Sequence, residues 1–289
     1  EPIRRDYSID EYASVSAPHG VVGSVYVQIN VPPGNEIEEV DYVTQEGHRA
    51  GLMQAVVSYA NLTSPDVAVT LDRQIQLGPV RGVRQQLHWH TNPTYRFADR
   101  PDLMMSEEFQ RGLRSLGQRD LHFELQVFVD QLHYAVDLVD EHPEIKFVLL
   151  HAGMLEDRTP TGWTTWRRWM SELARRHNVT VKLSGLGTFD HECSVELWRP
   201  VISETVEMFG ATRCMFGSNF PVEFVIAGTA DAPQLLELAQ QISMKCMTDP
   251  AAQGLFYFPP LIDLKIAQPQ SEIVIDREKV AALGLNLSQ

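Results

Sequence analysis

The feature that most constrains the fold of this chain is an unbroken alternation of short apolar strands with helices. Seven segments rich in valine, isoleucine and leucine alternate with eight segments of helical pattern. Such strands, joined by helical crossovers, are typical of a parallel sheet covered on its faces by helices. The predicted strands are 21–29, 52–59, 80–86, 122–128, 146–151, 179–184 and 214–218. The predicted helices are 9–17, 36–50, 65–77, 107–117, 131–141, 162–176, 196–209 and 232–247.

The count of elements indicates which parallel sheet this is. The chain opens on a helix and has one strand fewer than helices, whereas a closed (β/α)₈ barrel needs eight strands. We therefore predict an α/β TIM barrel whose first strand is missing from this sequence, with a seven-stranded doubly wound sheet as the alternative. Residues 1–254 form the predicted barrel. Residues 255–289, where the pattern stops, form a predicted C-terminal extension packed on the barrel or on a partner subunit.

The composition of the chain limits the kinds of molecule that it is expected to bind. The net charge of -14 and the pI of about 5.1 disfavour binding to nucleic acid, because an acidic surface repels phosphates. The sequence has no apolar run long enough to span a membrane, and its three cysteines lack metal-type spacing. We therefore expect reduced thiols, a cytoplasmic location, a small-molecule substrate and a homo-oligomeric state.

Alternation along the predicted strands places side chains. In the strand over 122–128, Phe123 and Leu125 face the helices, which directs Glu124 and Gln126 toward the barrel axis. The carboxyl ends of parallel strands meet at one mouth, where barrel enzymes keep their sites. By the same alternation, the other inward-facing candidates are Tyr26, Gln28, Arg84, His88 and Lys182. We expect Gln28, Arg84, His88, His90, Gln126 and Lys182 to bind substrate.

Several of these residues have two interpretations that stay open here. His88 and His90 have the spacing that puts two imidazoles on one face of a strand, where they share a metal; a substrate contact or a plain loop role is the alternative. Lys182 either binds an anionic substrate or forms an internal ion pair with Glu124. Arg84 either holds a carboxylate in a bidentate manner or belongs to a structural pair.

Two strand ends carry the candidate catalytic residues. The strand over 146–151 ends in His151, and the small residues that follow it let a ligand approach. The last predicted strand runs through Gly217 and Ser218 into Asn219, and the carboxylate Glu223 lies four residues farther on. We expect His151, Asn219 and Glu223 to be catalytic.

Four segments, taken in order, resemble the amidohydrolase-2 branch of the amidohydrolase superfamily. They are Gly-Val-Arg at 82–84, Val-Leu-Leu-His-Ala-Gly at 148–153, Val-Lys-Leu-Ser-Gly-Leu-Gly at 181–187 and Arg-Cys-Met-Phe-Gly-Ser-Asn-Phe-Pro-Val at 213–222. These barrel hydrolases include 2-pyrone-4,6-dicarboxylate lactonase and sugar lactonases, and the branch also contains decarboxylases. The resemblance spans roughly residues 7–247.

The resemblance implies roles for single residues. His151 matches the strand-six histidine of the family, which is a metal ligand or a proton-transfer group. Asn219 stands where many members place an aspartate, and an amide does not take up a proton as a carboxylate does. Glu223 is the obvious replacement, and Asp190 or Glu156 are loop alternatives. The first-strand His-x-His pair of the family is absent, so the metal ligands stay unknown, with His151 a candidate; a divalent ion (zinc or manganese) and a metal-free mechanism both stay open.

These observations predict a hydrolase of a small carboxylated or sugar-like lactone or ester. Water, activated by a carboxylate such as Glu223, would attack the carbonyl, and the anionic substrate would be held by Arg84, Lys182 and His88. One alternative is a decarboxylase of an aromatic or unsaturated carboxylic acid on the same fold. Another is a catalytically silent subunit of a complex, motivated by Asn219 and the missing first strand.

Overall fold

The sheet is parallel and follows the order of the chain. The computed structural model describes residues 5–19, 21–189 and 194–222. In this part of the chain, seven strands form one sheet in the order β1-β2-β3-β4-β5-β6-β7. The strands are β1 Ser24–Val27, β2 Met53–Ser58, β3 Val80–Arg84, β4 His122–Leu125, β5 Phe147–Leu149, β6 Val179–Leu183 and β7 Cys214–Phe216. The α-helices are α1 Ile9–Ser16, α2 Glu36–Ala50, α3 Val67–Leu77, α4 Glu107–Gly117, α5 Leu132–Glu141, α6 Pro160–Ala174 and α7 Val195–Phe209.

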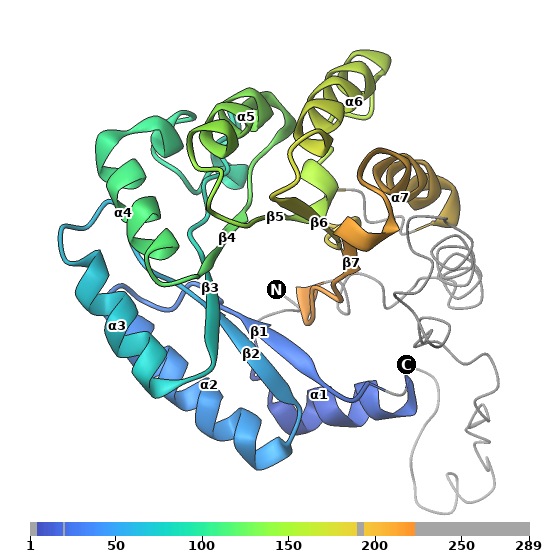
Figure 1. Cartoon of the computed structure of the whole chain (residues 1–289). Helices are drawn as coiled ribbons and strands as arrows, with labels where there is room; N and C mark the ends of the chain where they lie inside the picture. Colours follow the sequence, from blue (N-terminus) through green and yellow to red (C-terminus); the bar gives the residue numbers. More distant parts are fainter. Residues whose placement is uncertain (1–4, 20, 190–193, 223–289) are drawn as a thin grey trace, which may run out of the picture.

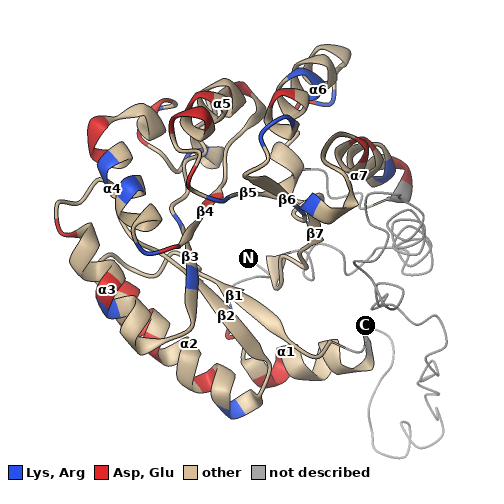
Figure 2. Ribbon diagram, viewed as in Figure 1, with Lys and Arg blue, Asp and Glu red and all other residues tan. Residues whose placement is uncertain are grey.

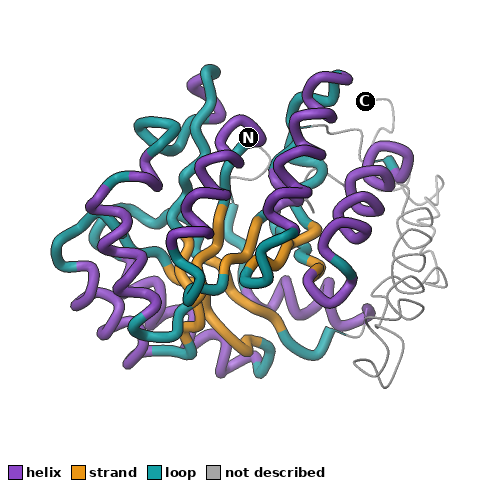
Figure 3. The backbone as a smooth tube through the Cα atoms, turned by 45° about the horizontal axis from the view of Figure 1, so that its top comes forward, coloured by secondary structure: helices purple, strands orange, loops and turns teal. Residues whose placement is uncertain are grey.

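The sheet curls, with the helices packed around its outside (Figures 1 and 3). A doubly wound sheet would reverse its strand order part-way and carry helices on both faces. The sequential order and the single outer layer of helices exclude that alternative, and the predicted barrel-type fold is confirmed. Among the described residues, β1 and β7 are the two edges of the sheet and are not paired with each other.

Helices are predicted more accurately than strands. Ser8 and Ser106 cap α1 and α4, each accepting a backbone N–H bond through its hydroxyl. Every strand is shorter than its predicted segment, and each loses one or more residues at its carboxyl end, where the loops of the mouth begin. The predicted helix 232–247 and the extension 255–289 lie outside the described residues, so the division of the chain at 254 stays a prediction.

The apolar faces of the strands build a core between sheet and helices. Phe123 and Leu125 of β4 are fully buried in it, as their alternation predicts. The rings of Phe109 and Phe123 meet edge to face with centroids 5.7 Å apart, and Phe147 of β5 continues the series. Such aromatic pairs add to the stabilisation from buried area. This core fixes the strands whose other face carries the polar residues.

The two edges of the sheet are linked by aromatic side chains. Phe220, in the loop after β7, lies 5.8 Å from the ring of Tyr7 and 5.3 Å from the ring of Tyr12, measured between centroids. Tyr12 is on α1, and α1 packs against α2 beside β1. The segment that precedes β1 therefore contacts the segment that follows β7.

Gly112 of α4 supplies a test of this packing. A Cβ at this position would lie 2.1 Å from the backbone oxygen of Leu62, which follows β2 and cannot move without disturbing the sheet. We expect Gly112→Ala to lower the free energy of unfolding by about 1–3 kcal/mol, the usual cost of overpacking. Urea unfolding measures it, with Arg111→Ala on the exposed face of α4 as the control. Equal stability of the two variants would contradict this packing.

Candidate active site

Three charged side chains from different strands meet on the inner side of the sheet. Lys182 of β6 donates from Nζ to Oε1 of Glu124 on β4, across the intervening β5. Arg84 of β3 is also buried here, and it pairs in register with Glu124. Of the two interpretations of Lys182, the structure has the internal ion pair. Figure 2 shows that most other charged residues lie on the outer helices.

Burial and neighbouring charges set the ionisation of this trio. Burial opposes the charge on Glu124, but His122, Lys182 and Arg84 hold the pKa of its carboxyl below the usual value. Burial lowers the pKa of Arg84, and the carboxylates of Glu124 and Glu39 act in the opposite direction. The two cations, Arg84 and Lys182, thus lie near two buried carboxylates, those of Glu124 and Glu39.

Some polar atoms of this interior are unsatisfied. An N–H of the Arg84 guanidinium donates to the backbone oxygen of Gln28. Arg84 Nε, Glu124 Oε2 and Gln126 Oε1 are buried and have no hydrogen-bond partner among the described residues. Buried polar groups are normally paired, with protein or with a bound molecule. The interior is therefore suited to hold a small polar ligand.

His151 stands at the end of β5 in a left-handed turn. The φ angles of His151, Ala152, Gly153 and Met154 are 54°, 49°, 76° and 51°. The imidazole Nδ1 lies 2.9 Å from the hydroxyl of Ser184, at the end of β6. Among the described residues, Nε2 has no hydrogen-bond partner, so it is the nitrogen available to a ligand. Left-handed backbone at non-glycine residues is strained and is concentrated at functional sites.

His151 is neutral at ordinary pH. Burial is the largest cause that lowers its pKa to about 3, and the positive charges of Arg84 and Lys182 lower it further. Glu124 and hydrogen bonding to Ser184 act in the opposite direction. The charges of Arg84 and Lys182 therefore lie close enough to His151 to affect its ionisation, and the three side chains lie at the same mouth.

The turn that carries His151 depends on close packing from two sides. Trp166 of α6 is fully buried and donates from Nε1 to the carbonyl oxygen of Ala152 at 2.8 Å. On the other side lies Gly185, with φ of 62°, where a Cβ would come within 2.3 Å of His151 Nδ1. A glycine after β6 therefore gives the imidazole its space.

His88 is a buried loop residue. β3 ends at Arg84, so the strand spacing that would put His88 and His90 on one face does not apply. The His88 ring lies against Phe97 and Phe128, with centroids 4.5 and 5.7 Å away. Burial, and then the Arg84 charge, lowers the pKa of His88 to about 4. Its Nδ1 is buried without a partner among the described residues.

His90 faces a carboxylate in the loop after β5. Its Nδ1 accepts the backbone N–H of Asn92 at 2.9 Å, and its Nε2 lies 3.9 Å from Glu156 Oε1. No group of three or more histidine, cysteine, aspartate or glutamate side chains in the described part of the chain is arranged to hold a metal ion. The shared-metal interpretation of His88 and His90 therefore finds no third ligand there.

The remaining candidates divide into structural and unassigned residues. Gln28 is fully buried and uses its amide internally: Oε1 accepts from Asn30 N at 2.6 Å, and Nε2 lies 3.4 Å from Arg84 O. Tyr26, expected to face inward, donates its hydroxyl to Glu39 of α2 at 2.8 Å and packs against the apolar core. Asn219 lies in the loop after β7 with φ of 49°, at the predicted end of the sheet.

Two candidate carboxylates, Glu223 and Asp190, lie outside the described residues. Sequence reasoning also missed Gln131, which joins two loops of the mouth. Its Oε1 accepts from the backbone N–H of Trp89 and Phe128, and its Nε2 donates to Leu87 O. No local pattern marks Gln131. The contact of Ser184 with His151 joins residues 33 positions apart, so no local pattern marks it either.

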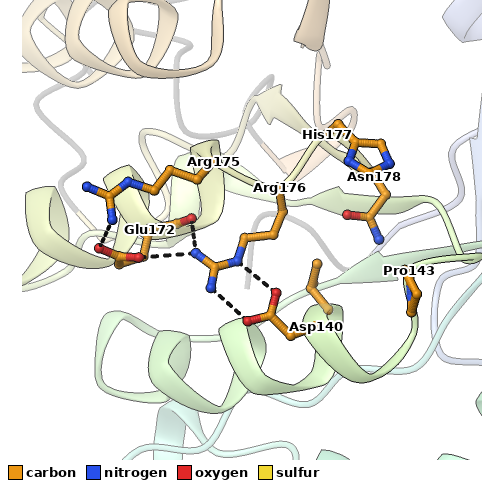
Figure 4. Close-up of a pocket in the computed structure, with 8 residues that line it drawn as sticks. Asp140, Pro143, Glu172, Arg175, Arg176, His177 and Asn178 are labelled. Carbon is orange, nitrogen blue, oxygen red and sulfur yellow. Dashed lines mark hydrogen bonds and ion pairs between the residues drawn. The ribbon is translucent and has the colours of Figure 1, made fainter.

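A surface hollow at the opposite end of the strands does not belong to this site (Figure 4). It has a volume of about 430 Å³ and lies beside the residues that precede β5 and β6. Its most buried charge, Arg176, is paired with both Asp140 and Glu172. The charges of this hollow are therefore satisfied, in contrast to those at the mouth.

Comparison with known proteins agrees with the fold. The sequence model of the amidohydrolase family matches residues 3–252. This chain belongs to the amidohydrolase family. It is a hydrolase of that family, as the resemblance predicts.

Relatives of this amidohydrolase carry lactonase names. An L-fucono-1,5-lactonase of Burkholderia ambifaria is 27% identical over 225 residues, which cover 77% of this chain and 72% of the relative. The uncharacterized protein y4mH of Sinorhizobium fredii is 30% identical over 221 residues, 76% of this chain and 74% of that protein. A crystal structure of an amidohydrolase from Burkholderia multivorans with bound zinc has a TM-score of 0.71 at 24% identity, over 86% of this chain and 84% of that one. This last likeness supports the barrel-type fold.

The space left by Gly185 can be tested without any substrate. In Gly185→Ala, the new methyl group would collide with His151 Nδ1, so we expect the imidazole to move and its hydrogen bond to Ser184 to break. The His151 side-chain signals in a ¹H–¹⁵N NMR spectrum would report the change. Gly210→Ala is a matched control, because Gly210 also has a positive φ but nothing within 4 Å of its Cβ position. Unchanged His151 signals in Gly185→Ala would refute this role of the glycine.

The depressed pKa of His88 predicts an acid-sensitive stability. The unfolded chain binds a proton to this histidine near pH 6.5, whereas the folded chain resists it until about pH 4, so stability falls as the pH drops through that window. Between pH 7.5 and 5, His88 alone accounts for about 2 kcal/mol of lost unfolding free energy. Urea unfolding at pH 7.5 and 5 would show a smaller loss in His88→Gln than in the wild type. An equal loss in both proteins would contradict the assignment.

Proposed function

We propose that this chain hydrolyses a small carboxylated or sugar-like lactone or ester by attack of water at the carboxyl ends of its strands. The observation that carries the proposal is the convergence of a neutral His151 with Lys182, ion-paired to Glu124, and with Arg84, whose Nε is buried without a partner among the described residues. A guanidinium N–H that lacks a partner favours a substrate with an anionic group. A neutral imidazole with a free Nε2 suits acyl chemistry at a carbonyl.

The low pKa of His151 indicates how this residue acts. With a pKa of about 3 it is a weak base, so in the ligand-free site its natural role is to polarise a carbonyl through a hydrogen bond. An anionic substrate beside Arg84 and Lys182 would offset their charges and raise the pKa of His151. Substrate binding would then prepare the same imidazole to pass protons.

Arg84 is positioned to bind the anionic group of the substrate. Its guanidinium retains an unpartnered Nε, and a planar guanidinium binds carboxylates in a bidentate manner. Lys182 contributes mainly through its charge, since its Nζ is engaged by Glu124. Gln126, buried with an unpartnered Oε1, is suited to accept a substrate hydroxyl. His88 and His90 border the site from the loop after β3.

The lactonase names of the relatives support the choice of a lactone as substrate. The catalytic roles of Asn219 and Glu223 stay predictions, as does a requirement for zinc or manganese with His151 as a candidate ligand. A neighbouring structure contains zinc. The described residues do not supply three ligands for such an ion, so the proposed hydrolysis includes no step at a metal.

Two further predictions concern where the enzyme is located and how its subunits assemble. The structure bears on the first only in that none of the described helices has the length and apolar character to cross a bilayer. A cytoplasmic location and a homo-oligomeric state stay predictions. The decarboxylase and silent-subunit alternatives differ from the proposal in their products: carbon dioxide in the first case, none in the second.

A panel of lactones tests the proposal directly. We expect the wild-type protein to release acid from at least one carboxylated or sugar lactone, followed by a pH indicator, and His151→Ala to lower kcat at least about a hundredfold. His177→Ala, an exposed histidine at the opposite end of the barrel, is the control. Near-wild-type turnover in His151→Ala would remove that residue from the mechanism. Carbon dioxide release from an aromatic acid, with no lactone opened, would favour the decarboxylase.

A further inference from the structure

We propose that Glu156 and His90 form a proton-carrying pair at the mouth of the barrel, in which the Glu156 carboxyl takes a proton from the attacking water and returns it to the leaving oxygen. This inference deepens the proposed lactone hydrolysis and rests on it. The pair joins the loop after β5 to the loop after β3. It fills the role that the amide of Asn219 does not perform, because an amide does not accept a proton.

The hydrogen bond from Asn92 fixes the tautomer of His90. The backbone N–H of Asn92 donates to Nδ1 at 2.9 Å, so in the neutral ring Nδ1 is the acceptor and the proton is on Nε2. That N–H faces Oε1 of Glu156 at 3.9 Å. The distance is too long for a direct hydrogen bond. A water or substrate oxygen beside the two atoms would contact both of them.

The environment of Glu156 is typical of a carboxyl group that acts in general acid–base catalysis. Only 18% of its side chain is exposed, and Oε2 is buried without a partner among the described residues. Burial is the largest cause that raises its pKa, and the negative charge of Asp130 adds to the rise. Hydrogen bonding from its own backbone, and then His90, act in the opposite direction. General acid–base catalysts work best with a pKa near the operating pH, so a raised carboxyl pKa is an advantage.

The other described carboxylates near the strand ends are engaged or exposed. Glu124 is committed to the buried ion pair. Glu39 accepts hydrogen bonds from the Tyr26 hydroxyl and the Ile29 backbone. Asp130 is exposed to solvent. Glu39 and Glu124 each keep one unpartnered buried oxygen as well, but their other oxygen is held by Tyr26 or Lys182. Glu156 is the one of these buried carboxyl groups that faces a histidine of the mouth and is not held by a hydroxyl group or an ammonium group.

Aromatic rings shield this pair on one side. Phe128, after β4, lies 5.2 Å from the His90 ring and 5.4 Å from Phe189, which follows β6. Tyr95 contacts both His90 and Phe189, with centroids 5.5 Å apart in each case. The cluster joins three loops of the mouth. Its apolar surface lowers the local dielectric constant, which strengthens electrostatic interactions at the pair.

The proposed step conserves protons. The ionised carboxylate of Glu156 removes a proton from water as the water oxygen bonds to the lactone carbonyl carbon. The ring C–O bond then breaks, and the protonated Glu156 donates that proton to the departing ring oxygen. One water is consumed, one hydroxy acid is formed, and Glu156 returns to its ionised state.

Kinetics of Glu156→Gln on the best lactone of the panel would test the role in turnover. We expect kcat to fall at least about a hundredfold with KM within about threefold, and Glu156→Asp to retain part of the rate. Glu141→Gln, at the exposed end of α5, is the matched control. The acid limb of the pH–rate profile would disappear in Glu156→Gln. Wild-type kcat in a folded Glu156→Gln protein would overturn the proposal.

A titration independent of activity tests the pair itself. Carbon-detected NMR would follow the Glu156 carboxyl, assigned by the loss of its signal in Glu156→Gln. His90→Gln removes one of the groups that lower the pKa of Glu156, so the titration should move to higher pH, whereas exposed His48→Gln should leave it unchanged. An unmoved titration in His90→Gln would overturn the pair. A moved titration without activity on any lactone would support the pair and count against lactone hydrolysis alone.

Discussion

The buried ion pair between Lys182 and Glu124 is the interaction on which the rest of the site depends. It joins β4 to β6 behind β5, in a region where Glu124 is 1% exposed. Desolvation makes such pairs poor sources of net stability, but loss of one partner typically costs about 3–5 kcal/mol because the other charge is left alone. Glu124 neutralises Lys182, whereas Arg84 keeps an unpartnered Nε that is suited to bind an anionic substrate. Burial, and then the charges of Arg84 and Lys182, keeps His151 neutral.

A second constraint is the space around the His151 turn. Four consecutive left-handed residues are held in place by the Trp166 hydrogen bond to Ala152, and the imidazole fits only because Gly185 has no side chain. Strained backbone of this kind persists where the surrounding packing determines it. The packing of α6 in the apolar core therefore affects the site directly, because α6 supports the turn that directs Nε2 of His151 toward the mouth.

Local patterns predicted the elements whose causes are local. The serine caps and the whole of α2 follow from neighbouring residues, and so does the burial of Phe123 and Leu125 opposite Glu124. Tyr26 was expected to face the barrel axis, but its hydroxyl binds Glu39 of α2, a partner 13 positions away that strand alternation does not indicate. The strand expected to carry His88 stops at Arg84, because the following segment bonds to Gln131 and to the loop after β4 instead of extending β3.

The sequence by itself determined the parallel α/β sheet, the family and the set of polar residues at the strand ends, because periodicity and short motifs are encoded along the chain. Only the tertiary structure decided what these residues do to one another. Lys182 meets Glu124 across 58 positions, and His90 meets Glu156 across two separate loops. Ionisation states follow from such distances and from burial, which fall off through space and not along the sequence. For this reason the neutral His151 and the partner of Lys182 emerged only once the strands were placed side by side.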